Sequence, residues 1–108
     1  MNTATNSDTT TTRFQLGQLF YTPGAQETLQ EYQVELFDLL NRHVRGDWGN
    51  VCADDAQANE DALKNGARLL SAYVLPPPEG SNLSANAKIW IITEADRSVT
   101  TLLLPEEY

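Results

Sequence analysis

The chain has 108 residues, 41% of them hydrophobic, which suits a single domain with one modest core. Fifteen acidic residues oppose seven basic ones, so the formal net charge of -8 repels nucleic-acid phosphate and anionic lipid. One cysteine and one histidine exclude an internal disulfide and disfavour a metal site built from these residues. Because we find neither a signal peptide nor an apolar run of about 20 residues, the sequence predicts a cytoplasmic protein that contacts neither membrane nor nucleic acid directly.

The start of the chain is rich in threonine. Residues 1–12 offer almost nothing that can be buried, which predicts a disordered leader ahead of a single domain of residues 13–108. In residues 13–21, apolar and polar residues alternate enough to predict a short strand or an extended arm. Its apolar contacts would be Phe14, Leu16 and Phe20. Both interpretations remain open.

Three helices are predicted next. Thr22 can cap the first, which has Pro23 at its first position and continues to residue 32. The second begins at residue 34 and ends before Gly46, and the third runs from Asp54 or Asp55 to residue 65, where Gly66 closes it. Apolar residues at helical spacing form the stripe of the second helix: Val34, Leu36, Phe37, Leu39, Leu40 and Val44.

Three strands follow the helices: residues 68–75 and a terminal hairpin within residues 88–108, with its turn at residues 95–98. The prolines at 76–78 cannot continue a central strand, so residues 76–87 form a loop. This order predicts an α+β fold with N-terminal helices packed on a small three-stranded antiparallel sheet. Parts of the strands are apolar on both faces, so a homodimer remains open. The expected core residues are Leu69 or Leu70, Tyr73, Ile89, Ile91, Val99, Leu102 and Leu104.

Two stretches carry a family resemblance. Residues 42–49, RHVRGDWG, and the segment beginning at Ile92, ITEADRS followed by TT and LLPEEY, resemble signatures of small bacterial proteins associated with plasmids and integrative elements. The resemblance implies a mobile-element accessory protein. Proteins that counter host defence, including antirestriction and anti-CRISPR proteins, are common in that setting.

The single histidine, His43, is the one candidate general base. Asp47 could orient it and Arg45 could bind an anion, which would define a small enzyme. The competing interpretation is that His43 and its neighbouring arginines complete a helix end while Trp48 packs into the core. We find no phosphate-binding loop, dinucleotide-binding motif or serine-nucleophile motif, so we expect no cofactor and favour a protein that is not an enzyme.

The helical half is strongly acidic, and a positively charged partner surface is its natural complement. We therefore predict binding to a basic protein surface, such as that of a host nucleic-acid-handling complex. The residues predicted to contact this partner are Glu27, Glu31, Glu35 and Asp38 in the helices, with Asp96 and Arg97 in the hairpin turn.

Overall fold

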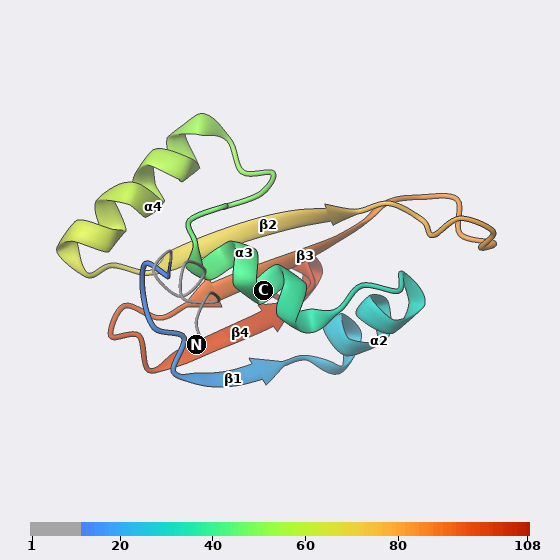
Figure 1. The fold of residues 1–108 in the computed structure, drawn as a ribbon, viewed down its shortest axis with the longest axis horizontal. Coiled ribbons are helices and arrows are strands. Elements are labelled where there is room, and N and C mark those ends of the chain that lie inside the picture. The colour runs from blue at the N-terminus through green and yellow to red at the C-terminus, as the bar shows by residue number, and fades with distance from the viewer. Residues whose placement is uncertain (1–11) are drawn as a thin grey trace, which may run out of the picture.

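The computed structural model describes residues 12–108 (Figure 1), so the predicted leader lies outside the described residues except for Thr12. The elements of the described part are β1 (Gln18–Tyr21), α2 (Pro23–Glu31), α3 (Leu36–Val44), α4 (Ala53–Asn65), β2 (Leu69–Leu75), β3 (Ala87–Thr93), β4 (Val99–Leu103) and a short 3-10 helix, η1 (Pro105–Glu107). The α+β class predicted from the sequence is confirmed. None of these helices is long and apolar enough to cross a membrane.

The sheet departs from the prediction by one strand. β2, β3 and β4 form the expected antiparallel meander, but β1 runs parallel to β4, and the described strands lie in the order β1-β4-β3-β2. The sheet is therefore mixed, and residues 13–21 contain a strand. Gln18 and Thr22 donate their N–H groups to the carbonyls of Ser98 and Leu102, at 2.8 and 3.0 Å. Because these partners lie at the far end of the chain, no local sequence pattern could reveal the pairing.

Gly17 allows β1 to approach β4. Its φ is +67°, in the left-handed region, and a Cβ at this position would collide with the carbonyl group of Ser98. Glycine is the residue that satisfies both conditions without strain. The pairing of β1 thus depends on a residue that carries no side chain.

The helix ends follow local capping chemistry. Thr22 Oγ1 accepts a hydrogen bond from the N–H of Ala25 at 3.0 Å at the start of α2, and Gly66 ends α4 with a φ of +76°, both as predicted. The start of α3 differs from the prediction, because Gln33 takes a φ of +57° and turns the chain out of α2. α3 therefore begins at Leu36 instead of at residue 34.

The main core lies on the sheet face that α2 and α3 cover. Tyr73, Ile89, Ile91 and Leu102 are fully buried there, as predicted. The structure buries Leu69 and leaves Leu70 half-exposed. Val99 and Leu104, which were also expected in the core, are only partly buried.

Two aromatic residues were wrongly assigned to buried positions. Phe37 is 67% exposed and Phe20 is 52% exposed. The side of α3 that faces the sheet is centred on Leu36, Leu40 and His43, so Phe37 lies at the rim of the buried stripe. Phe20 lies on the outermost strand, where little of the chain can cover it.

The β2 edge of the sheet is closed by groups from other parts of the chain. Ala72 donates its N–H to the Trp48 carbonyl at 3.0 Å and accepts from the N–H of Asn50 at 2.6 Å. The side chain of Asn59, on α4, binds both backbone groups of Leu70, at 3.0 Å to its N–H and 2.7 Å to its carbonyl. Asn59 therefore replaces a neighbouring strand at this position.

The β1 edge is different. Residues 18 and 22 direct their N–H groups toward β4, so the alternate residues, Leu19 and Tyr21, direct theirs away from the sheet. No described residue hydrogen-bonds the backbone of Leu19 or Tyr21 from that side. One edge of the sheet is thus closed, whereas the backbone of the other has no hydrogen-bond partner among residues 12–108.

Candidate functional site

The histidine belongs to a buried chain of polar side chains. His43 Nδ1 lies 2.5 Å from Ser71 Oγ on β2, and its Nε2 lies 2.9 Å from Thr93 Oγ1 on β3. Thr93 Oγ1 lies 2.7 Å from Thr100 Oγ1 on β4, which donates to the Leu16 carbonyl at 2.7 Å. The four polar residues are 0% exposed. Their hydrogen bonds join α3 to three strands and to the segment before β1.

Burial keeps His43 neutral. Loss of solvent, and then the positive charge of Arg97, lower the pKa of His43 from 6.5 to about 3. The rings of Phe14 and Trp48 pack beside the imidazole, with centroid distances of 5.0 and 5.9 Å. Both ring nitrogens have partners, and a side chain without exposed surface cannot reach a substrate. This geometry favours a structural role for His43.

The three residues of the predicted catalytic set do not come together. The carboxylate of Asp47 accepts from Arg42 Nε at 2.7 Å and from the Gly49 N–H at 3.2 Å, and no hydrogen bond joins it to His43. The Arg42 hydrogen bond is the main reason that the pKa of Asp47 lies below its usual value. Arg45 is an exposed residue at the C-terminal cap of α3.

Arg42 instead organises the turn that follows α3. Its guanidinium lies 4.5 Å from the centre of the Tyr73 ring, and Tyr73 Oη donates to the Asp47 carbonyl at 2.7 Å. Burial raises the pKa of Tyr73 to about 12, so this phenol stays protonated. Trp48 is 6% exposed and donates from Nε1 to Glu60 at 3.1 Å, which confirms that it packs into the core.

The hairpin turn is held by Asp96 and Arg97, the two residues of the turn that were predicted to contact a partner. Arg97 donates to the carbonyls of Ala67 and Ala62, at 2.7 and 3.1 Å, and so ties the turn to the end of α4. Asp96 Oδ1 accepts from the N–H and the hydroxyl of Ser98, at 3.0 and 2.6 Å. Both bonds lower the pKa of Asp96, and the bond from the Ser98 hydroxyl has the larger effect. A partner contact at this turn stays a prediction.

The four acidic residues predicted in the helices are all exposed. Glu27 and Glu31 lie on α2, Glu35 occupies the N-cap position of α3 without a side-chain capping bond, and Asp38 lies in the first turn of α3. No cation within residues 12–108 forms a salt bridge with any of them, whereas three carboxylates elsewhere do, namely Asp47, Glu60 and Glu94. Within the described part of the chain, these four carboxylates are exposed and form no ion pair.

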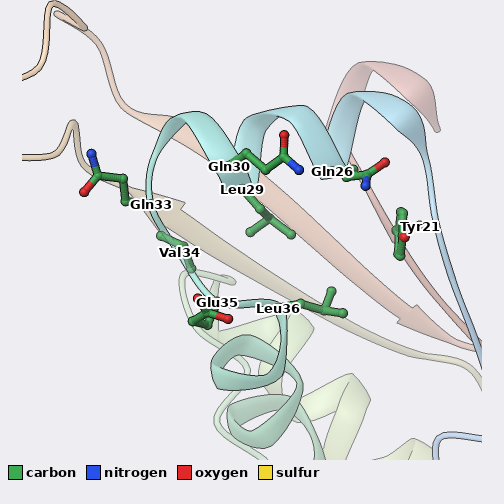
Figure 2. A pocket seen from close by; sticks show the side chains of 8 residues that line it. All are labelled: Tyr21, Gln26, Leu29, Gln30, Gln33, Val34, Glu35 and Leu36. Atoms are coloured by element: carbon green, nitrogen blue, oxygen red, sulfur yellow. The ribbon is translucent and has the colours of Figure 1, made fainter.

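Glu35 and Asp38 each line a hollow. The larger, of about 530 Å³, lies between α2, the start of α3 and the end of β1. Figure 2 shows Leu29 and Leu36 on opposite sides of it, with Tyr21 at one end and Gln33 at the other. The second hollow, of about 440 Å³, lies beside α3 and is lined by Leu16, Phe37, Asp38, Leu40, Asn41 and Val44.

β1 itself supplies surface that the sequence interpretation did not identify. Leu19, Phe20 and Tyr21 are consecutive and are 38%, 52% and 48% exposed. The signal in the sequence was a four-residue segment with no charge and no regular polar alternation. Such a segment is unusual on an exposed strand, where charges normally discourage pairing with other chains.

Comparisons with protein-family models, curated proteins and solved structures found no match to this chain. Within residues 12–108, no group of three or more His, Cys, Asp or Glu side chains is arranged to hold a metal ion. The arrangement that remains as a candidate site is the surface formed by the four acidic residues, the two hollows and the exposed strand β1.

Proposed function

We propose that this protein acts by binding a basic surface of another macromolecule through Glu27, Glu31, Glu35 and Asp38. The observation that carries the proposal is that these carboxylates are exposed and unpaired within the described chain. A cationic partner could therefore pair with them without first breaking an ion pair of the protein. The net charge of -8 would also speed the encounter with such a partner.

The sequence resemblance supports a biological setting for this binding. Residues 42–49 and the segment from Ile92 resemble proteins of plasmids and integrative elements. We place the partner among host complexes that handle nucleic acid in the cytoplasm, and the protein among counter-defence factors of the antirestriction or anti-CRISPR kind. Such complexes hold nucleic acid in basic grooves, which an acidic protein can occupy.

The test compares two variants with equal charge changes. The first replaces Glu27, Glu31 and Glu35 with Gln and Asp38 with Asn. The control replaces four other exposed acidic residues in the same way: Asp54, Asp55, Asp61 and Glu79. Both variants should fold, because exposed charges contribute little to stability.

The measurement is capture of host proteins by the tagged chain, followed by association kinetics with the purified partner at salt concentrations from about 50 to 300 mM. The first variant should associate more slowly and with a flatter salt dependence than the wild type, while the control should stay close to the wild type. Equal binding by all three proteins would remove the acidic residues from the function.

A further inference from the structure

The open edge of the sheet and the two hollows next to it form one surface, which we call the edge groove. It comprises Leu19 and Tyr21 of β1 together with the residues that line the two hollows. We propose that the edge groove binds an extended segment of another protein, with apolar and basic residues on the same face of the segment, as an added strand beside β1. This inference rests on the proposed function and specifies where the basic partner binds and in which conformation.

The backbone of β1 provides the first argument. The N–H and carbonyl groups of Leu19 and Tyr21 point away from β4, and no described residue bonds them. At the opposite edge, the outward N–H and carbonyl groups of Leu70 are hydrogen-bonded by Asn59. Those of Ala72 are hydrogen-bonded by Trp48 and Asn50. One molecule thus contains a closed edge and an open edge, and main-chain hydrogen bonds at the open edge are what strand addition uses.

The side chains near β1 provide the second argument. Leu19 and Tyr21 pair in register with Thr100 and Leu102, whose buried side chains face the helices, so Leu19 and Tyr21 lie on the helix side of the sheet. Consecutive residues of α3 line the two hollows, Leu36 the first and Phe37 the second, so both hollows border the start of α3. A strand added about 4.8 Å from β1 would direct every second side chain toward them.

The charges in the edge groove select the chemistry of the added strand. Glu35 is the charged residue among those that line the first hollow, Asp38 is the charged residue of the second, and no cation lines either within the described chain. Apolar side chains suit Leu29, Leu36 and Phe37, whereas lysine or arginine two residues along the strand, on the same face, would pair with the two carboxylates. The occupant therefore carries both apolar and basic side chains among the alternate residues that face the hollows, while the residues between them point to the other face of the sheet.

A second copy of the chain fits this surface less well. Pairing of β1 with β1 of another copy would supply Leu19, Phe20 and Tyr21, but β1 carries no cation. It would also bring a second Glu35 and a second Asp38 to the same side of the joined sheet, where like charges repel. The acidic residues would remain unpaired, so the charge complementarity favours a different, basic chain.

The test uses a random peptide library displayed on phage and selected on the immobilised wild-type protein, with counter-selection on Leu19→Pro. Proline at position 19 removes an outward N–H and blocks the approach of a strand, while the bonds that residues 18 and 22 make to β4 remain. Enriched peptides are then synthesised and titrated by fluorescence anisotropy. A matched set is N-methylated at alternate amides, which blocks strand pairing from the peptide side and leaves the protein unchanged.

We expect enrichment of peptides in which apolar residues and Lys or Arg both occur among alternate positions, i, i+2 and i+4, so that they share one face of the strand. Leu19→Pro and alternate N-methylation should each weaken binding about tenfold or more, because each removes main-chain hydrogen bonds. Glu35→Gln with Asp38→Asn should weaken binding and flatten its salt dependence, whereas the control, Asp55→Asn with Glu79→Gln, should not. Hydrogen exchange at the amides of Leu19 and Tyr21 should slow when peptide binds, a readout that needs no variant.

Enrichment of acidic peptides, an absence of enrichment, or equal binding by N-methylated peptides would overturn the inference. A concentration-dependent dimer in sedimentation experiments that Leu19→Pro dissociates would overturn it in favour of a second copy.

The proposed function fails separately. If neutralising the four acidic residues abolishes capture of the host partner while Leu19→Pro does not, the acidic surface stands and strand addition falls. Peptide binding at β1 without any effect of the acidic residues would reject the basic occupant.

Discussion

Acidification should destabilise this protein through its single histidine. His43 is neutral and fully buried between Ser71 and Thr93, whereas the same imidazole is solvated in the unfolded chain. Its pKa in the fold is about 3, below its ordinary value of 6.5. Between these two pKa values, the imidazole is protonated in the unfolded state and neutral in the folded state. The free energy of unfolding therefore has its full value above about pH 6.5 and falls as the pH decreases toward about 3.

The size of the effect follows from the two pKa values. The full difference corresponds to roughly 5 kcal/mol, at 1.36 kcal/mol for each pH unit. At pH 4.5 about 3 kcal/mol of this is already lost. Such a loss is a large part of the 5 to 15 kcal/mol that stabilises a typical domain.

The assay is urea denaturation from about pH 7 to pH 4.5, with His43→Gln as the reference. Glutamine cannot titrate and can still donate a hydrogen bond, so we expect the variant to be less stable at pH 7 and to lose less stability on acidification. Carboxylates with lowered pKa, such as Asp47 and Glu60, also cost stability at low pH, but they are present in both proteins and cancel in the difference.

An NMR titration of the wild type gives a test that does not depend on the variant. Because the chain has one histidine, its Cε1–Hε1 signal is assigned without ambiguity. The signal should keep the shift of a neutral imidazole while the protein remains folded. Titration of the folded protein near pH 6.5, or parallel stability curves for wild type and His43→Gln, would refute the reasoning.

Two further predictions concern stability. Trp48→Ala should lower the free energy of unfolding by about 3–5 kcal/mol in urea titrations, because it empties a core site and removes the indole hydrogen bond to Glu60, which keeps only its bonds from Arg13; stability equal to the wild type would show that this ring is not part of the core. Arg97→Lys should cost about 1–2 kcal/mol and speed hydrogen exchange at the end of α4, because lysine cannot reproduce the fork of bonds to the carbonyls of Ala62 and Ala67; unchanged exchange would contradict this role.

The sequence predicted those parts of the fold that local chemistry determines. Thr22 and Pro23 mark the start of α2 and Gly66 marks the end of α4, because capping depends on a few neighbouring residues. The antiparallel meander follows from short connections between consecutive strands. The pairing of β1 with β4 joins the two ends of the described chain, and no local pattern encodes it.

The candidate site was predictable only in part. The exposure of Glu27, Glu31, Glu35 and Asp38 follows from their charge, and the structure places them as expected. The role of His43 could not be read from its neighbours, because its hydrogen-bond partners come from β2 and β3. The exposed surface of β1 was missed for a related reason, since large apolar side chains are buried more often than exposed.

The side chain of Asn59 has a consequence for the assemblies this protein can form. An open-ended fibre built by edge pairing needs two accessible edges in each subunit, one to receive a neighbour and one to offer to the next. In this sheet Asn59, together with Trp48 and Asn50, already occupies one of them. Growth must therefore stop after a single addition, and the amide group of one asparagine helps to make the exposed strand β1 compatible with a discrete complex instead of a polymer.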